Sequence, residues 1–449
     1  MLIKFLGAAG TVTGSSYVLT SGAGSSIIID LGMFQGTPEV EKLNYEPFDY
    51  DVRNLSGMVL THAHLDHCGR LPILLSKGFK ESIWMTPATR DLTQLSLLDS
   101  AKIAKNGDHE VLYDENLALK AISKFKTFNY HAPITIGDFT INAIDAGHIL
   151  GSASLEIEDK HPNSQIRKIV FSGDLGNSPE PLEKETELVS TSDAVVLEST
   201  YGDRLHPHLN PSDAIQSEIN SIEKSGGTLL IPAFSLERTQ ELLHMIMHLK
   251  EEKKVAPTTP IYMDSPMAKK ATVFYLDYKE LLNSHIQADL QKRNPFEFTG
   301  LKVIQSPQES ESLHKQPGPK VIIAGSGMMV GGRILNHAAY YLPLASTRLL
   351  IVGFQGEGTL GRQLFEGSKK IVIEGQKVNV MATVSDTQAM SSHADQKQLL
   401  GWLSHIKNVK KVFLTHGEDV SRTALSKKIS QELRIEDVAL PKLNQEIEI

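Results

Sequence analysis

The chain has 449 residues, of which 41% are hydrophobic and 22% charged, and its formal net charge is −8. This length fits two or three domains, and the moderate charge with 33 glycines and 20 prolines excludes a disordered or collagen-like chain. The negative net charge also disfavours a protein that coats nucleic acid with its whole surface.

The single cysteine, Cys68, cannot form an internal disulfide, which indicates a reducing compartment, and we expect a cytoplasmic protein. The sequence contains no run of about 18 consecutive apolar residues, so it predicts no membrane span. Glycine-rich sequence from residue 7 interrupts the apolar start of the chain, so we expect no signal peptide and no membrane partner.

Short β-branched runs alternate with amphipathic stretches along the chain, which predicts an α/β protein. Apolar residues at a spacing near 3.6 predict a helix over 235–250, and loop-like composition at 206–212 and 305–319 suggests domain edges. We expect strands at 26–30, 58–61, 139–144, 168–172, 194–198, 228–232, 321–324, 348–354 and 411–415.

The run THAHLDHCGR at 61–70 follows a predicted strand and holds four residues of metal-ligand type, His62, His64, Asp66 and His67. In a loop that leaves a strand, this spacing lets the first two histidines face one metal while the other two ligands face a second. Imidazole and carboxylate suit zinc, although manganese also accepts nitrogen and oxygen ligands. The run therefore predicts a centre for two metal ions.

Further residues of ligand type stand directly after apolar runs, where open α/β sheets place their chemistry. They are His148, Asp174 and His416. Each alone would be an ordinary loop residue, but together with the first cluster they are expected in the same metal centre.

These motifs resemble the metallo-β-lactamase fold hydrolases, and within them the β-CASP nucleases. The resemblance covers essentially the whole chain, from FLGAAGTVTGS at 5–15 to LTHGE at 414–418. It implies a metallo-β-lactamase αββα sandwich formed by residues 1–205 and 375–449, with a β-CASP α/β domain inserted at 206–374.

The resemblance also implies a ligand set for two zinc ions. His62, His64 and His148 would hold one ion, Asp66, His67 and His416 would hold the other, and Asp174 would bridge both. Asp30 matches the family's carboxylate behind the ligands, which would fix the tautomer of a ligand histidine.

Three β-CASP motifs point to the substrate. Glu198 in ESTYGDR matches the first motif, His393 in SSHAD the second and His416 the third. DNA-processing members usually carry valine at the third position, so His416 resembles the RNA-processing branch. The run HAHLDHCG looks like the nucleases related to the cleavage and polyadenylation specificity factor, which implies a ribonuclease that cuts single-stranded RNA internally, trims it from the 5′ end, or does both.

Phosphodiester hydrolysis needs a nucleophile, neutralisation of charge and a proton for the departing oxygen. Two zinc ions sharing a hydroxide would supply the first two, with Asp66 steering the hydroxide. His393, oriented and kept protonated by Glu198, is expected to act as the general acid.

Two strand-to-helix turns of the expected insertion, at 231–240 and 325–333, resemble the family's contacts to the RNA backbone. Hydroxyl, guanidinium and backbone N–H groups at such turns can hold a phosphate. The expected contacts are Ser235, Arg238, Ser326, Gly327, Arg333, His337 and Ser392.

Other functions remain open. They are a DNA nuclease, a small-molecule ester or thioester hydrolase of the same fold, and an RNA-binding scaffold without activity, which the complete ligand set disfavours. The oligomeric state is also open, a homodimer included. His244 and His248 stand four residues apart without the glutamate of a zincin motif, and we interpret them as helix surface.

Overall fold

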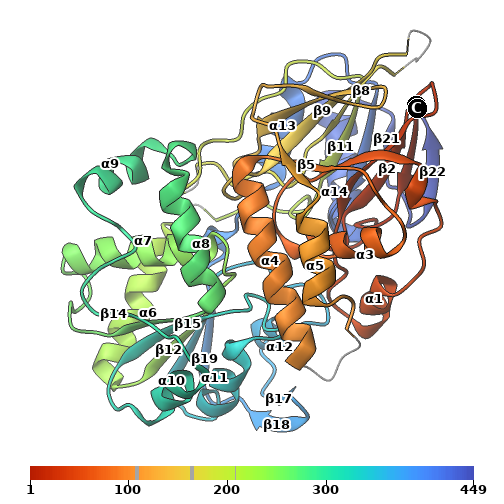
Figure 1. Cartoon of the computed structure of the whole chain (residues 1–449). Coiled ribbons are helices and arrows are strands. Elements are labelled where there is room, and N and C mark those ends of the chain that lie inside the picture. Colours follow the sequence, from red (N-terminus) through yellow and green to blue (C-terminus); the bar gives the residue numbers. More distant parts are fainter. Residues whose placement is uncertain (107–110, 162–165, 180, 208) are drawn as a thin grey trace. The chain divides into compact units, whose positions relative to one another are not determined.

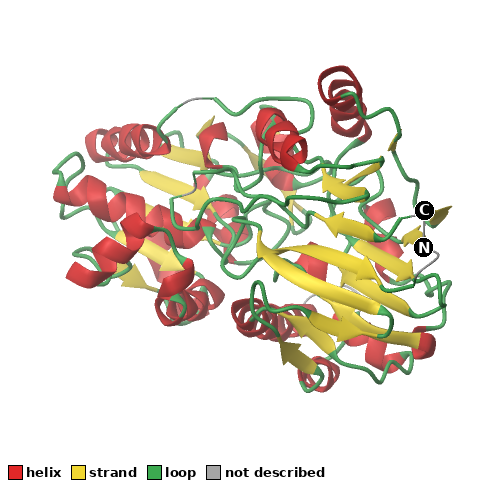
Figure 2. Ribbon diagram, turned by 90° about the horizontal axis from the view of Figure 1, so that it is seen from above, coloured by secondary structure: helices red, strands yellow, loops and turns green. Residues whose placement is uncertain are grey.

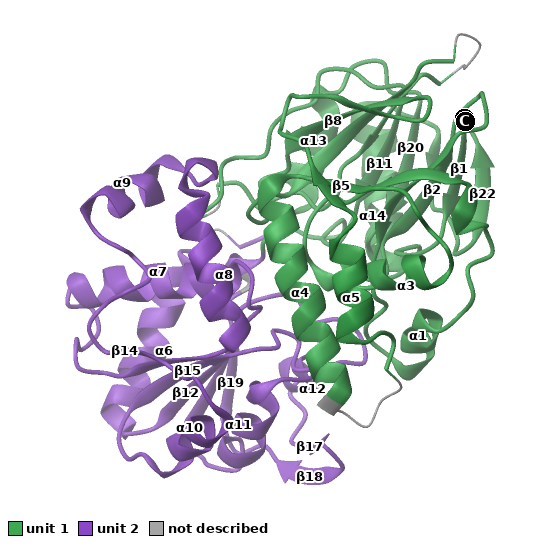
Figure 3. Ribbon diagram, in the orientation of Figure 1, with its two compact units in different colours: residues 1–205, 392–449 green, residues 206–391 purple. Residues whose placement is uncertain are grey.

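The computed structural model describes residues 1–106, 111–161, 166–179, 181–207 and 209–449. They form two compact units, unit 1 with residues 1–205 and 392–449 and unit 2 with residues 206–391 (Figure 3). Unit 2 extends past residue 374, where the sequence analysis expected it to end. It does so because β19 (Thr383–Asp386) pairs in parallel with β16 (Thr347–Ile351) inside the sheet of unit 2.

Unit 1 contains two seven-stranded sheets. The first, in spatial order, is β22 (Gln445–Glu448), β1 (Leu2–Phe5), β2 (Ser16–Thr20), β3 (Ser26–Leu31), β4 (Leu55–Val59), β5 (Ile83–Met85) and β6 (Phe125–Thr127). The second is β21 (Val438–Ala439), β20 (Lys411–Thr415), β11 (Ala194–Glu198), β10 (Lys168–Phe171), β9 (Ala153–Asp159), β8 (Phe139–Asp145) and β7 (Ile134–Ile136).

The two sheets pack face to face, because alternate residues of their strands are apolar and point inward. Ile27 and Val59 of the first sheet share one core with Ile169 of the second. Aromatic pairs join the layers: the ring centroids of Phe5 and Phe413 lie 5.2 Å apart.

Helices cover both outer faces, which completes the αββα order of layers (Figures 1 and 2). Leu71, Leu97 and Ala118 pack on the first sheet, and Leu399 and Leu425 on the second. The α-helices of unit 1 are α1 (Pro38–Glu41), α2 (Leu65–Cys68), α3 (Leu71–Ser76), α4 (Pro87–Asn106), α5 (Glu115–Ile122), α13 (Gln396–His405) and α14 (Asp419–Lys428). The predicted fold class is thereby confirmed.

Unit 2 contains a six-stranded parallel sheet, a two-stranded antiparallel sheet and surrounding helices. The six strands, in spatial order, are β14 (Leu301–Val303), β13 (Ile261–Asp264), β15 (Lys320–Ala324), β12 (Thr228–Pro232), β16 and β19, and the two-stranded sheet is β17 (Lys370–Ile373) with β18 (Gln376–Asn379). The α-helices are α6 (Pro211–Ser225), α7 (Arg238–Glu251), α8 (Pro266–Asp277), α9 (Ser284–Lys292), α10 (Pro307–Ser312), α11 (Arg333–Tyr341) and α12 (Leu360–Phe365).

Most predicted elements lie within a few residues of the observed ones. The predicted strand 58–61 is observed earlier, as β4, since the chain leaves the sheet after Val59 to form the ligand loop. The predicted helix 235–250 begins later, at Arg238 of α7, after a turn in which Glu237 adopts a φ of 68°. In the part of the chain that the structure describes, no helix has the length and apolarity needed to cross a membrane.

Candidate metal centre

The predicted metal ligands of unit 1 meet at one end of its two sheets. His62 follows β4, His148 follows β8, Asp174 follows β10 and His416 follows β20. Two further predicted ligands, Asp66 and His67, lie on the short helix α2 (Leu65–Cys68) after the same loop as His62. The side chains converge because open sheets direct the carboxyl ends of parallel strands to one edge.

The first group consists of His62, His64, His148 and Asp174, whose ligand atoms all lie within 4.8 Å of one another. The Nδ1 atom of His64 lies 3.2 Å from Nε2 of His62 and 3.2 Å from Nε2 of His148. Ligands held about 2.1 Å from one tetrahedral ion have similar separations. This group therefore fits a single metal ion.

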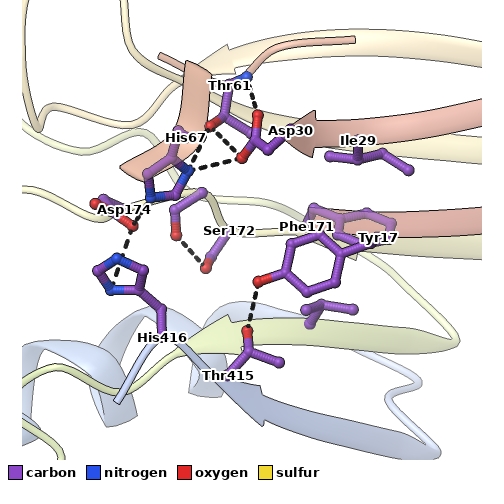
Figure 4. Close-up of a pocket in the computed structure, with 12 residues that line it drawn as sticks. Tyr17, Ile29, Asp30, Thr61, His67, Phe171, Ser172, Asp174, Thr415 and His416 are labelled. Atoms are coloured by element: carbon purple, nitrogen blue, oxygen red, sulfur yellow. Dashed lines mark hydrogen bonds and ion pairs between the residues drawn. The ribbon is translucent and has the colours of Figure 1, made fainter. Parts of the chain in front are cut away.

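The second group consists of Asp66, His67 and His416. The Nε2 atom of His416 lies 3.3 Å from Oδ2 of Asp66. Asp174 also faces this group, because its Oδ1 lies 3.3 Å from Nε2 of His67 and 3.7 Å from Nδ1 of His416. Figure 4 shows Asp174 and the rings of His67 and His416 pointing toward one another.

Asp174 presents one carboxylate oxygen to each group. Its Oδ2 lies 3.5 Å from Nε2 of His62 and 3.6 Å from Nε2 of His148, while Oδ1 faces the second group. Among the described residues neither oxygen has a hydrogen-bond partner, although the residue is only 1% exposed. Because a buried carboxylate without hydrogen bonds is costly, the residues present fit a cation on either side of Asp174.

Hydrogen bonds behind the ligands orient their rings. Nδ1 of His67 donates to Asp30 Oδ2 over 2.7 Å, and Thr61 donates its backbone N–H and its hydroxyl to the same carboxylate over 2.8 Å each (Figure 4). Nδ1 of His148 donates to the carbonyl of Ser392 over 2.9 Å. These contacts direct Nε2 of both histidines toward Asp174. Metal-ligating histidines are commonly oriented by such hydrogen bonds to their second nitrogen.

Burial and neighbouring charges adjust the protonation of the ligands. Burial lowers the pKa of His62 and His148 well below the usual value and that of His64 to about 4, which favours the neutral imidazole that binds metals. Burial acts to raise the pKa of Asp174, but the surrounding histidines, His416 first, lower it well below the usual range. The carboxylate is therefore ionised and the three histidines neutral near pH 7.

His393 and Glu198 lie together beside the first ligand group. Glu198 ends β11, and its carboxylate accepts hydrogen bonds from the Leu175 N–H and the Thr200 hydroxyl, both over 2.7 Å. Nδ1 of His393 lies 3.3 Å from the same carboxylate, and the ring centroids of His393 and His148 are 4.6 Å apart. Burial acts to lower the pKa of His393, but the charge of Glu198 raises it to about 9.

Three of the residues expected to contact RNA, Ser235, Arg333 and His337, contact Asp264 or Ser265 at the end of β13 in unit 2. His337 is fully buried, and its Nε2 lies 2.7 Å from Oδ2 of Asp264, a carboxylate that also pairs with Arg333. The hydroxyl of Ser235 lies 2.9 Å from that of Ser265, whereas Arg238 is buried and pairs with Glu241.

The turn at 325–333 is ordered by its own side chains. The hydroxyl of Ser326 accepts hydrogen bonds from the N–H groups of Val330 and Gly331 over 3.0 and 3.3 Å. A Cβ at Gly327 would lie 2.6 Å from the Phe234 ring, so only glycine fits. Ser392 lies in unit 1, where its carbonyl accepts the hydrogen bond from Nδ1 of His148. The contacts between these residues and RNA stay predictions.

The sequence analysis missed Asp264, which joins two of the expected contact residues. Asp264 is the last residue of β13 (Ile261–Asp264), so it stands at the end of an apolar run, much as Asp174 stands shortly after the apolar run of β10. Thr61 and Thr200, which hold the carboxylates of Asp30 and Glu198, were also missed. They were missed because a hydroxyl residue next to a ligand motif has no characteristic spacing that would indicate its role.

Comparison with known proteins identifies the family. Residues 9–193 match the metallo-beta-lactamase superfamily, residues 239–364 the Beta-Casp domain and residues 377–441 the Zn-dependent metallo-hydrolase RNA specificity domain. The chain is 35% identical to Ribonuclease TTHA0252 of Thermus thermophilus over 100% of both chains. It is 30% identical to Cleavage and polyadenylation specificity factor 73 of Drosophila melanogaster over 94% of this chain and 61% of that protein.

A crystal structure of a protein of unknown function from Enterococcus faecalis V583 matches this fold with a TM-score of 0.54 over 99% of both chains, at 12% sequence identity. This likeness concerns the fold alone. The family matches and the curated relatives confirm the resemblance drawn from the motifs: the chain belongs to the β-CASP family of the metallo-β-lactamase superfamily.

Proposed function

We propose that the protein is a ribonuclease that hydrolyses phosphodiester bonds of single-stranded RNA at a centre of two zinc ions in unit 1. The observation that carries this proposal is the position of Asp174, whose two oxygens face two separate groups of ligands. The match to an RNA specificity domain and the relatives named as a ribonuclease and a polyadenylation-linked cleavage factor support RNA as the substrate.

The two ligand groups would each hold one ion, with Asp174 shared between them. His62, His64 and His148 would complete one site, and the other three ligands, Asp66, His67 and His416, would complete the second. Zinc suits this mixture of imidazole and carboxylate, and manganese is the alternative that nitrogen and oxygen ligands also accept. When bound, such ions activate water as a nucleophile and neutralise the charge of a phosphate.

His393 would donate the proton that the departing oxygen needs. It is held against Glu198, which raises its pKa to about 9 against the effect of burial and so keeps the ring protonated near pH 7. Its side chain is 15% exposed and that of Asp66 is 20% exposed, whereas those of His62, His148 and Asp174 are buried. A substrate would therefore reach the centre on the side of His393 and Asp66.

We also propose the domain roles and the phosphate contacts. Unit 1 would be the metallo-β-lactamase domain and unit 2 the inserted β-CASP domain. Ser235 and Ser326, in the turns after β12 and β15, and Arg333, at the start of α11, would contact the RNA backbone. The lone cysteine supports a cytoplasmic location.

The test is cleavage of matched 5′-labelled single-stranded RNA and DNA, with and without chelator, beside an Asp66→Ala variant. Chelator-sensitive cleavage of RNA alone, absent in the variant, is the expected result, and the fragment lengths distinguish internal cutting from trimming at the 5′ end. Cleavage of DNA at an equal rate would contradict the RNA assignment. Two bound metals with no cleavage of either polymer would favour a small ester or thioester substrate.

A further inference from the structure

A second group of potential metal ligands lies in unit 2 and takes no part in the proposed reaction. His244 and His248 are four residues apart on α7 and therefore share one face of the helix. The interpretation of these histidines as helix surface was wrong for His244, which is only 8% exposed. Asp289, on α9, faces both rings, and α7 and α9 belong to the same unit (Figures 1 and 3).

Three ligand atoms converge here. Nε2 of His244 lies 3.0 Å from Oδ2 of Asp289, Nε2 of His248 lies 2.9 Å from the same oxygen, and the two Nε2 atoms are 3.0 Å apart. The three atoms thus form a nearly equilateral triangle.

Hydrogen bonds alone do not satisfy this triangle. Each Nε2 carries at most one hydrogen, which points in a single direction. If both nitrogens carry hydrogens and donate to Asp289, no hydrogen lies between the two nitrogens, which are 3.0 Å apart. If only one of the two nitrogens carries a hydrogen, that hydrogen can lie along one edge of the triangle, and the remaining close contacts have none. A single cation, by contrast, attracts all three lone pairs at once.

The dimensions also suit a metal ion. Ligand atoms about 2.1 Å from an ion lie about 3 Å from one another at octahedral angles and about 3.4 Å at tetrahedral angles. The three edges measure 3.0, 3.0 and 2.9 Å, close to the octahedral separation. Two imidazole nitrogens with one carboxylate oxygen are donors typical of first-row transition metals, whereas magnesium and calcium prefer oxygen alone.

The surroundings allow an ion to enter and to keep water ligands. The His248 side chain is 40% exposed, so one side of the triangle is open to solvent. The positive charge of Lys292 would repel a cation at this site, since its Nζ lies 3.5 Å from the other oxygen of Asp289. That lysine side chain is 74% exposed, so solvent screens its charge and the ammonium can move away.

We propose that His244, His248 and Asp289 form a third metal site, which binds zinc or a similar divalent transition metal and links α7 to α9 within unit 2. Its ligands are all distinct from those of unit 1, so the site does not depend on the proposed function. Three protein ligands and an open side predict an exchangeable ion rather than a permanently enclosed one.

Calorimetric titration of the metal-free full chain with zinc tests this site. His248→Ala and Asp289→Asn should each bind one zinc fewer per chain than the wild type, whatever the wild-type number is. The wild type should also gain thermal stability from the additional ion, and both variants should lose that gain. Circular dichroism without metal shows whether the variants are folded. If His248→Ala is unfolded, the zinc content of Asp289→Asn alone tests the site.

His285→Ala is the matched control, since His285 is an exposed histidine on the same helix as Asp289. It should bind as many zinc ions as the wild type. An equal number of zinc ions in the wild type, His248→Ala and Asp289→Asn would overturn the proposal, and so would the same loss in His285→Ala.

Discussion

Nδ1 of His393 lies 3.3 Å from both carboxylate oxygens of Glu198, a residue 195 positions earlier in the chain. The contact brings the end of β11 against the loop that precedes α13. Because Leu175 and Thr200 hold the carboxylate by hydrogen bonds, Glu198 can fix both the orientation and the charge of the imidazole.

Replacing His393 by alanine should separate metal binding from catalysis. The two proposed ligand groups, His62, His64, His148 with Asp174 and Asp66, His67 with His416, do not include this ring, although it also lies within 4.8 Å of Asp174 and His416. His393→Ala should therefore keep its metals, whereas the loss of a general acid should lower kcat about 10²- to 10⁴-fold. Single-turnover cleavage and elemental analysis measure the two effects. The exposed His405 provides the control, as His405→Ala should change neither. Metal loss in His393→Ala as large as in a ligand variant would refute the assignment.

The pH dependence of cleavage should respond to Glu198. A general acid works while protonated, so the rate should fall as pH rises through the pKa of His393, which Glu198 raises to about 9 despite burial. Glu198→Gln removes the negative charge and should move this alkaline fall to lower pH. Profiles of kcat over roughly pH 6 to 10 test the shift, and an unchanged alkaline limb would show that Glu198 does not set the pKa.

Asp174 should be needed for both metals at once, because each of its oxygens faces one ligand group. Asp174→Ala should therefore lose bound metal and cleavage together, and added zinc should not restore the rate. Asp213, an exposed aspartate on α6, provides the control, and Asp213→Ala should behave as the wild type. Full metal content in Asp174→Ala would contradict a shared ligand.

Arg333 should affect the affinity for RNA more than the chemical step. Its guanidinium pairs with Asp264 and remains partly exposed, at 19% of its side chain. Arg333→Ala should raise KM about tenfold, equivalent to about 1.4 kcal/mol, with little change in kcat. The slope of the logarithm of RNA affinity against the logarithm of salt concentration should become shallower by about one unit, which corresponds to one lost phosphate contact. Arg434→Ala, at an exposed arginine of unit 1, should leave KM unchanged. A change in kcat alone would argue against a binding role.

Lys250 should stabilise the fold of unit 2. Its buried ammonium donates to the carbonyls of Pro257, Thr259 and Thr299 over 3.0, 2.6 and 3.1 Å. Lys250→Met keeps the apolar stem but leaves these carbonyls without their donor, and it should lower the free energy of unfolding by about 1 to 3 kcal/mol. Denaturant titration measures the loss, and Lys253→Met, at an exposed lysine nearby, should cost far less. Equal costs would mean that the three hydrogen bonds add nothing.

Several features could be predicted from the sequence because their signals are local. Strand and helix periodicity predicted the α/β class, and β11, β12 and β20 have the predicted bounds. The run at 61–70 revealed four ligand-type residues, since a short loop after a strand keeps such residues close whatever the rest of the fold does.

Other features depend on packing between distant segments. The triangle of His244, His248 and Asp289 forms only where α9 meets α7, and no spacing along the chain indicates that meeting. The partner of His337, Asp264, is likewise 73 residues away.

The sequence by itself determined which residues are of metal-ligand type and where they stand relative to the predicted strands, because residue type and local spacing are properties of the chain. Only the tertiary structure decided which atoms face each other, as with the two oxygens of Asp174 and their separate ligand groups. The reason is physical: burial of the apolar faces sets how strands and helices pack, and that packing alone brings distant polar side chains within bonding distance.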